Sequence, residues 1–294
     1  MLLDRKAVRR NFDRAASSYL NAAAIAHEVH TRLSERLALV KLGPLRVVDL
    51  GGGGNRDTAM LTRRFPKASV TIADLSPGML CATRRALPWY APLLATLRAR
   101  RTSMICADMH RLPFATGSID LLWSNLTLLW AIDLPAALQE CARVLTPGGL
   151  FMFSSCGPDT LRELRQLPDG GAHVHTFPDM HDVGDGLMRA GLADPVMEMD
   201  KLSVTYSGWP ALRKELRQIG AGNALRVRPR GLGGRRFASE LRDLRPNPDG
   251  KLSVTVEVVY GHAWKALPRP RAAGAGTQSV VRLHRPQTQQ TKPE

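Results

Sequence analysis

The sequence RVVDLGGGGN, residues 46–55, carries the strongest structural signal in the chain. Its apolar, mostly β-branched run ends at a cluster of glycines, which is typical of a buried parallel strand that enters a tight turn before a helix. Glycines accept positive φ angles and let the backbone pass close to a ligand. The helix is predicted over 57–65, with Asn55 and Asp57 as candidate N-caps.

A second predicted strand strengthens this interpretation. Residues 68–73 form another short apolar run, and Asp74 follows it directly. Asp74 lies about 20 residues beyond the glycines, where nucleotide-binding βαβ units place a carboxylate on the ribose. The two strands and the glycine turn therefore predict a nucleotide-type site.

Further short apolar strands alternate with helices along the chain. The remaining strands are predicted at 102–107, 118–124, 150–155, 196–206 and 252–260. The later helices are predicted at 76–87, 134–145, 159–167 and 179–190. This order predicts an α/β fold with a doubly wound, mostly parallel, seven-stranded sheet of the Rossmann-like type.

The chain divides into three predicted parts. Residues 1–42 form an N-terminal helical cap, and 43–265 form the main domain. Between the last two strands, 207–250 is predicted to be a lid or docking insertion, with an arginine- and glycine-rich stretch at 226–236. Residues 266–294 are rich in Pro, Arg and Gln, which predicts a disordered basic tail.

The net charge is strongly positive for an otherwise ordinary globular composition. The chain has 294 residues, 44% of them hydrophobic, and a formal charge of +15 from 41 basic and 26 acidic side chains. One interpretation is a GC-rich genome that encodes Arg in place of Lys. The other is an acidic partner, which could be a nucleic acid, a membrane surface or an acidic protein.

The cysteines and the charge pattern indicate a cytoplasmic protein. The four cysteines show no CxxC spacing, so neither a disulfide framework nor a zinc site is expected. The N-terminus lacks the apolar core of a signal peptide. The most apolar segment, 121–138, contains polar residues and is too short to span a bilayer. His173, His175, Asp179 and His181 lack a helical HxxxH spacing, so we expect no metal.

Polar residues occur at the carboxyl ends of successive predicted strands, where doubly wound folds bind ligands. They are Asp49 with the glycines, Asp74, Asp108 and Asn125. No lysine follows the glycines as it would in a phosphate-binding loop. Carboxylates repel a pyrophosphate but suit hydroxyls, an amine and a positively charged sulfonium. The site therefore favours S-adenosylmethionine over NAD or ATP.

The motifs resemble those of class I S-adenosylmethionine-dependent methyltransferases. VVDLGGGGN is similar to their first motif, and IADLSPGML, CADMHRLPF and RVLTPGGLF match later motifs in order. The cofactor-binding residues implied by the resemblance are Asp49, Gly51, Gly53, Asp74, Leu75, Asp108, Met109 and Asn125.

The resemblance also implies individual roles. Gly51 and Gly53 approach the methionine part of the cofactor, and Asp74 holds both ribose hydroxyls. Asp108, with the backbone of Met109, reads the adenine.

Two further positions complete this implied site. Asn125 and Leu126 line the wall near the methyl group. Asn55 stands where the family has its third glycine. Asparagine tolerates left-handed backbone angles, so we expect binding to persist with altered affinity.

A longer resemblance runs from about residue 8 to residue 265. FDRAASSY, SNLTLLW, the segment 177–206 and VEVVYGHAWK are similar to the malonyl-acyl-carrier-protein O-methyltransferases of biotin synthesis. The segment 177–206 also resembles a mitochondrial complex I assembly factor that hydroxylates arginine, but the YGHAWK ending favours the bacterial methyltransferases. Leu129 stands where this family usually has Gln, which affects an expected substrate contact.

The implied reaction moves a methyl group from the sulfonium to the free carboxylate of a malonyl thioester on acyl carrier protein. A carboxylate is already ionised at neutral pH, so no strong general base is required. Alignment of the reactants and exclusion of water can supply the rate. Candidate catalytic residues are Asn125, Tyr19 and His181.

Each of these candidates also has a structural interpretation. Asn125 could be a buried, hydrogen-bonded amide, and Tyr19 could brace the N-terminal helix instead of closing over the cofactor. Trp130 could contact the acyl arm or only pack. The candidate docking residues for the acidic carrier are Arg226, Arg228, Arg230, Arg235 and Arg236, which could equally form a solvated loop.

Two rival functions remain from the sequence. One is a methyltransferase-fold arginine hydroxylase or respiratory-complex assembly factor. The other is a nucleic-acid methyltransferase, suggested by the charge but opposed by the lack of an NPPY-type motif. We expect a monomer that binds neither membrane nor nucleic acid.

Overall fold

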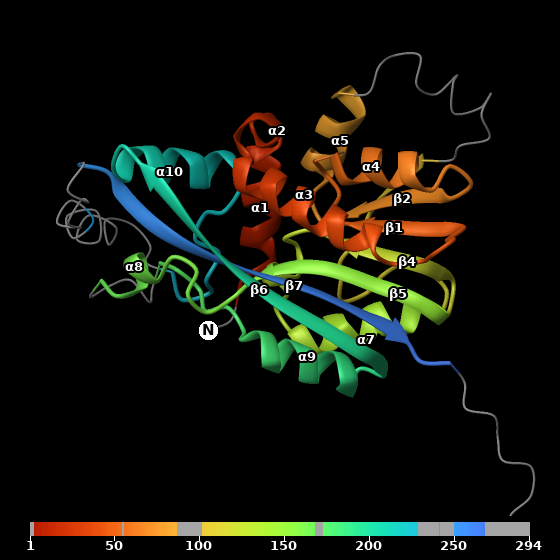
Figure 1. The fold of residues 1–294 in the computed structure, drawn as a ribbon. Coiled ribbons are helices and arrows are strands. Elements are labelled where there is room, and N and C mark those ends of the chain that lie inside the picture. Colours follow the sequence, from red (N-terminus) through yellow and green to blue (C-terminus); the bar gives the residue numbers. More distant parts are fainter. Residues whose placement is uncertain are drawn as a thin grey trace, which may run out of the picture.

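The computed structural model describes residues 3–54, 56–86, 102–167, 173–228, 241 and 250–267. Within them, seven strands form one sheet in the order β3-β2-β1-β4-β5-β7-β6 (Figure 1). The strands are β1 (Arg46–Leu50), β2 (Ser69–Asp74), β3 (Thr102–Cys106), β4 (Ile119–Ser124), β5 (Leu145–Cys156), β6 (Leu192–Tyr206) and β7 (Leu252–Lys265). The helices are α1 (Arg5–Ala15), α2 (Tyr19–Ala22), α3 (Ala24–Ala38), α4 (Arg56–Arg64), α5 (Pro77–Ala86), η1 (Leu128–Trp130), α7 (Leu134–Val144), α8 (Arg162–Arg165), α9 (Met180–Arg189) and α10 (Trp209–Gln218).

The sheet is parallel except at β7, which runs antiparallel to both β5 and β6. The predicted doubly wound, mostly parallel, seven-stranded sheet is therefore confirmed. Three strands are longer than predicted: β5 begins at Leu145 instead of residue 150, and the pairing of β6 with β7 continues to Leu192 opposite Lys265. The sequence signal for this extension was masked by Pro195, which lies in a bulge of the edge strand β6, where a proline removes no ladder hydrogen bond.

Helices cover both faces of the sheet, and neighbouring strand residues alternate between the two cores. Val48 and Leu122 pack with α7 and α9, whereas Val47 and Leu121 pack with α3 and α4. Figure 1 shows α7 and α9 on one side of the sheet and α4 and α5 on the other. This arrangement leaves the carboxyl ends of the parallel strands free of core helices.

The predicted N-terminal helical segment is present as three helices, α1 to α3. Asp4 caps α1 by accepting hydrogen bonds from the backbone of Lys6 and Ala7. At one edge of α1, Asp13 Oδ1 accepts hydrogen bonds from Ser76 Oγ at 2.6 Å and from Gly78 N at 3.0 Å. These bonds hold α1 against the start of α5, across the carboxyl ends of the strands.

The insertion between β6 and β7 begins with α10. Beyond it, most of the predicted lid lies outside the described residues, as do Asn55 and all but the first two residues of the predicted tail. The lid and the tail therefore stay predictions. Within the described part of the chain, no helix has the length and apolar character needed to cross a membrane.

Candidate active site

A small cavity of about 70 Å³, which we call the polar cavity because Asp74 and Asp108 line it, lies at the carboxyl ends of β1, β2 and β4. The predicted cofactor residues that line it are Gly51, Asp74, Leu75, Asp108, Met109 and Asn125. Gly53 lies directly behind Asp74, to which its backbone N–H donates a hydrogen bond at 3.2 Å. The strand ends thus bring the predicted residues together in the way that their positions in the sequence imply.

The glycine turn has no room for side chains. Gly51 has a φ angle of +78°, and a Cβ atom there would lie 1.9 Å from Thr127 Oγ1. A Cβ atom at Gly53 would lie 2.7 Å from Asp74 Oδ2. Gly51 N also donates a hydrogen bond of 2.6 Å to the carbonyl of Ala73. The turn is therefore pressed against β2 and the β4 end, with its backbone at the cavity wall.

Asp74 presents a carboxylate with unused acceptor capacity. Its Oδ1 accepts from Ser76 N at 2.7 Å, and its Oδ2 accepts from Gly53 N. Burial raises its pKa to about 6, against the lowering effect of these two hydrogen bonds. Each oxygen keeps a further lone pair, so the ionised group can accept bonds from two neighbouring hydroxyls.

Asp108 is held in place by two partners. Its Oδ1 accepts from His110 N at 3.0 Å and lies 2.7 Å from His110 Nδ1, and its Oδ2 lies 2.7 Å from Arg5 Nη1. Burial alone would raise the pKa of Asp108, but the His110 hydrogen bonds and the charges of His110 and Arg5 lower it overall. Asp108 therefore stays ionised at neutral pH.

Helix α1 forms a roof over this cavity. Arg5, Val8 and Phe12 all line it, and Tyr19 lies beyond them. Burial raises the pKa of the Tyr19 hydroxyl far above its usual value, so the phenol stays protonated. A Cβ atom at Gly54 would lie 3.2 Å from Tyr19 Cε1, so the ring packs on the glycine turn. This placement suits the predicted closing role of Tyr19.

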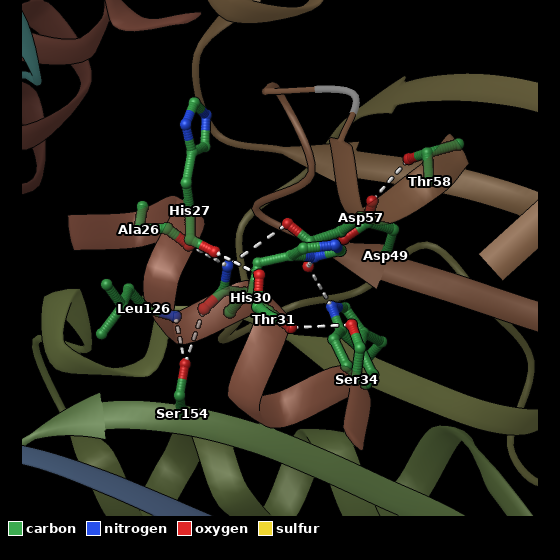
Figure 2. Close-up of polar contacts among 12 residues, drawn as sticks. Ala26, His27, His30, Thr31, Ser34, Asp49, Asp57, Thr58, Leu126 and Ser154 are labelled. Carbon is green, nitrogen blue, oxygen red and sulfur yellow. Dashed lines mark hydrogen bonds and ion pairs between the residues drawn. The ribbon is translucent and has the colours of Figure 1, made fainter. Parts of the chain in front are cut away.

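A buried polar network lies behind the glycine turn (Figure 2). Asp57 Oδ1 accepts from Trp123 Nε1 at 2.8 Å and lies 2.8 Å from His30 Nδ1. Asp49 is 1% exposed and accepts a hydrogen bond from Thr58 Oγ1. Burial, followed by the negative charge of Asp57, raises the pKa of Asp49 well above its ordinary value. Asp49 therefore supports the turn from behind and does not line the cavity.

The same network holds the side chain of Asn125. Its Nδ2 donates to Ala26 O at 3.2 Å and to Asp57 Oδ2 at 3.4 Å, and its Oδ1 accepts from Ser154 Oγ at 2.8 Å. The amide thus has structural partners on both ends, as in the buried-amide interpretation. Asn125 still lines the cavity, so its catalytic role stays a prediction.

The next residue, Leu126, has a φ angle of +48°. This conformation is costly for a leucine and persists where the surroundings enforce it. The backbone N–H of Leu126 donates to the buried Ser154 Oγ at 2.9 Å, as Figure 2 shows. Leu126 separates the polar cavity from a second one.

The second cavity is larger, about 440 Å³, and mainly apolar. It lies between α2, α10, β7 and the segment 173–177. The two cavities adjoin, since the residues that line both are Phe12, Tyr19, Leu126 and Trp130. The Trp130 ring packs edge-on against Phe12, with centroids 5.4 Å apart. This position suits the predicted contact of Trp130 with an acyl arm.

His175 is one of the polar residues that line the larger cavity, and its place there was not predicted from the sequence. Its ring lies 5.3 Å from Trp130 and bonds to the backbone of Leu129. Burial lowers the pKa of His175 to about 4, so the ring is neutral at pH 7. Its Nε2 is buried and has no hydrogen-bond partner among the described residues.

Several predicted residues lie elsewhere. His181 is 80% exposed, pairs with Asp179 at the start of α9 and lines neither cavity, so the structure does not bring it to the site. Arg226 Nε donates to the backbone of Leu3 at 3.2 Å, and Arg228 Nη1 lies 3.1 Å from Asp4 Oδ2. Both arginines thus bind the N-terminal segment. The docking candidates that lie outside the described residues are Arg230, Arg235 and Arg236.

Arg5 and Asp13 hold α1 over the cavity, and Asp57 is the centre of the buried network; these roles were not predicted from the sequence. A signal existed for α1, because Arg5, Arg9 and Asp13 recur at four-residue spacing on one helix face. The described residues contain no group of three or more His, Cys, Asp or Glu side chains that could hold a metal ion.

Comparison with known folds identifies the core. A family model described as "Methyltransferase domain" matches residues 48–153. The YcgJ protein of Bacillus subtilis has a TM-score of 0.56 at 15% identity, covering 81% of this chain and 99% of that one. A putative methyltransferase of Haloferax volcanii in complex with the activator Trm112 has a TM-score of 0.54 at 19% identity, covering 90% of this chain and all of that one. These structures share the fold.

Relatives of nearly full length are much more similar in sequence. A malonyl-acyl-carrier-protein O-methyltransferase of Laribacter hongkongensis is 44% identical over 287 residues, covering 96% of each chain. Enzymes with the same name from Gallionella capsiferriformans and Methylovorus are 42% and 44% identical, each over 93% of this chain. With the methyltransferase motifs at the polar cavity, these likenesses show that the chain belongs to the malonyl-acyl-carrier-protein O-methyltransferase family.

Proposed function

We propose that this chain transfers a methyl group from S-adenosylmethionine to the free carboxylate of a malonyl thioester carried by acyl carrier protein, an early step of biotin synthesis. One observation carries the proposal: a small cavity lined by carboxylates that can accept hydrogen bonds from a nucleoside adjoins a larger apolar cavity suited to a thioester arm, and the two share the four lining residues named above. The names of the full-length relatives supply the substrate class. Methyl donor and acceptor would then meet at Leu126.

The residues of the polar cavity fit S-adenosylmethionine chemically. Asp74 has acceptor capacity for two ribose hydroxyls, and Asp108 can accept from an adenine amino group. A Cβ atom at Gly51 would collide with Thr127 and one at Gly53 with Asp74, so only glycine keeps the backbone of the turn in this position at the cavity wall. The carboxylates of Asp74 and Asp108 give the cavity a negative field, which favours a sulfonium over a phosphate.

The chain's own residues supply positioning and exclusion of water. In the proposed step a malonyl carboxylate oxygen forms a bond to the methyl carbon as the bond from carbon to sulfur breaks, and its electron pair stays on sulfur. No proton moves, so none of the described residues needs to act as a base. The roof of α1 and the rings of Tyr19 and Trp130 shield the place where the cavities meet, and alignment there supplies the rate.

We also propose a monomeric, cytoplasmic protein. The thiols of Cys81 and Cys106 are exposed and free, which suits a reducing compartment. Size-exclusion chromatography with light scattering tests the monomer, for which we expect a mass near 32.2 kDa. A stable mass of twice that value would contradict it.

The direct test is an assay with malonyl-acyl carrier protein and S-adenosylmethionine labelled in the methyl group. We expect label in a methyl ester that mild base releases as methanol. Acetyl-acyl carrier protein, which has no free carboxylate, is the matched control and should take up no label. If malonyl-acyl carrier protein also stays unlabelled, the proposal is wrong.

A further inference from the structure

The opening of the larger cavity is marked by two arginines of α10. Most of its described lining residues are buried or half-buried, whereas Arg213 and Arg217 are exposed. These two residues are four positions apart and therefore lie on one face of the helix, a single turn from each other. They are the exposed members of the described lining, so the cavity reaches the protein surface beside them.

The exposed face of α10 carries cations and no acid. Arg213, Lys214 and Arg217 are all exposed. The acid of this helix, Glu215, is half-buried and hydrogen-bonded to the hydroxyl of Tyr206, and burial raises its pKa. Within the described part of the chain, no carboxylate pairs with any of the three cations. Their charge is therefore available to a partner.

Helix α1, which lies next to α10, carries two further exposed cations. Arg10 and Arg14 are exposed and, among the described residues, form no ion pair. The two helices are joined, because Asn11 Nδ2 donates to Gly222 O at 3.0 Å and Ser18 Oγ donates to Gln218 O at 2.9 Å. Figure 1 shows α1 and α10 at the same end of the molecule.

We propose that the acyl carrier protein docks on this surface, which we call the basic face and define as Arg10, Arg14, Arg213, Lys214 and Arg217. The inference rests on the proposed function. A carrier holds its thioester at the end of a prosthetic arm, so its protein surface must meet the enzyme where the cavity opens. Carrier proteins are acidic, and their arm is attached through a phosphate, which arginine binds well. Complementary charge also speeds association.

This placement differs from the docking site expected from the sequence. Arg228 is paired with Asp4, and Arg226 is bonded to the N-terminal backbone, so both have structural partners. The basic face instead includes Arg213 and Arg217, the two exposed arginines that line the larger cavity. The two docking sites therefore predict that charge reversal at different residues will lower kcat/KM for the carrier substrate.

The test compares two substrates in three proteins. The substrates are malonyl-acyl carrier protein and malonyl pantetheine, which has neither the carrier nor the phosphate. The proteins are the wild type, a double variant Arg213→Glu with Arg217→Glu, and a control Arg84→Glu with Arg85→Glu, which makes the same charge change on exposed residues of α5. The readout is the ratio of kcat/KM for the carrier substrate to kcat/KM for malonyl pantetheine.

We expect this ratio to fall at least tenfold in the α10 variant and less than twofold in the control. Arg213→Lys with Arg217→Lys should recover most of the ratio, which a folding defect would not allow. An unchanged ratio in the α10 variant, or an equal fall in the control, would overturn the docking proposal. If the wild type methylates neither substrate, the proposed function fails and the docking proposal fails with it.

Discussion

The two cavities of this molecule differ in how the chain builds them. The polar cavity uses the ends of neighbouring parallel strands, and its acids have fixed partners, such as Ser76 N for Asp74 and His110 for Asp108. The apolar cavity is assembled from helices, loops and β7 residues that lie far apart in the sequence. Its polar atom on His175 has no partner among the described residues.

The difference matches the two tasks that we propose. A nucleoside has the same polar groups in every reaction cycle, so carboxylates that are held in place by protein donors and keep further acceptor capacity suit it. A flexible thioester arm offers mainly apolar contact and a few polar groups, so an apolar cavity that contains an unpartnered polar atom, His175 Nε2, suits it. Leu126, held in a strained conformation by Ser154, forms the boundary between the sites. The following predictions test this division.

The largest effect is expected from Asp74→Ala. The change removes the acceptors for both ribose hydroxyls, and charged hydrogen bonds contribute about 1.5–3 kcal/mol each. We expect the Kd for S-adenosylmethionine to rise roughly 100-fold or more, measured by calorimetric titration. The exposed α9 variant Asp185→Ala should bind normally. Normal binding by Asp74→Ala would remove the ribose assignment.

A large side chain in the apolar cavity should weaken binding of the acyl substrate and leave cofactor binding unchanged. Leu129 lines the apolar cavity and not the polar one. We expect Leu129→Trp to raise KM for malonyl-acyl carrier protein about tenfold, since overpacking costs about 1–3 kcal/mol. The Kd for S-adenosylmethionine should change less than twofold. Leu39→Trp, at a residue 86% exposed, is the matched control. A loss of cofactor binding in Leu129→Trp would contradict two separate sites.

Acid should weaken the binding of S-adenosylmethionine to the polar cavity. Burial raises the pKa of Asp74 to about 6 in the unliganded protein, so protonation removes the carboxylate below that pH. If the ionised form binds the ribose, Kd should rise roughly tenfold between pH 7.5 and 5. Calorimetry across this range checks the slope, and a flat profile would contradict the assignment.

Acid should change the stability of the unliganded protein in the opposite direction. The folded pKa of Asp74 lies above its ordinary value of 3.8, so the folded state holds more protons between about pH 6 and 4. The contribution of Asp74 to the free energy of unfolding therefore rises as the pH falls through this window. Urea unfolding of wild type and Asp74→Asn at pH 7.5 and 5 isolates it. The wild type should gain stability relative to the variant at pH 5, and a relative loss would contradict the burial argument.

The smallest effect is expected at Ser154, which holds Leu126 at the boundary between the two cavities. Ser154→Ala removes the partner of the Leu126 N–H and of the Asn125 amide oxygen, both at a buried position. We expect the free energy of unfolding to fall by about 1–3 kcal/mol, with kcat reduced more than either binding constant. Ser155→Ala, at the next buried residue of β5, should cost less. Equal losses would indicate that the Ser154 bonds contribute nothing specific.

The polar half of the site could be predicted because strand ends are local features of the sequence. Asp74 and Asp108 each follow a recognisable strand, and parallel strands bring their carboxyl ends together. What the sequence does not contain is the partner of each side chain. Asn125 could be located but not assigned its bonds to Ala26 and Ser154, which lie 99 and 29 residues away.

The apolar cavity could not be predicted, because the sequence does not show which distant residues come into contact. Residues of α2, α10 and β7 meet only through the tertiary fold, and an apolar residue that lines a cavity looks like one that fills the core. Arg228 shows the limit for charges. Its basic surroundings in the sequence fit a docking residue and a solvated loop equally well, and neither shows the ion pair that it makes with Asp4 at 3.1 Å.

The most direct measurement is a crystal structure with S-adenosylhomocysteine and a non-hydrolysable malonyl pantetheine analogue. We predict the ribose hydroxyls on Asp74, the arm in the cavity beside Trp130, and the malonyl carboxylate next to the sulfur at Leu126. A nucleoside bound in the larger cavity, or an arm bound away from Trp130, would contradict the account.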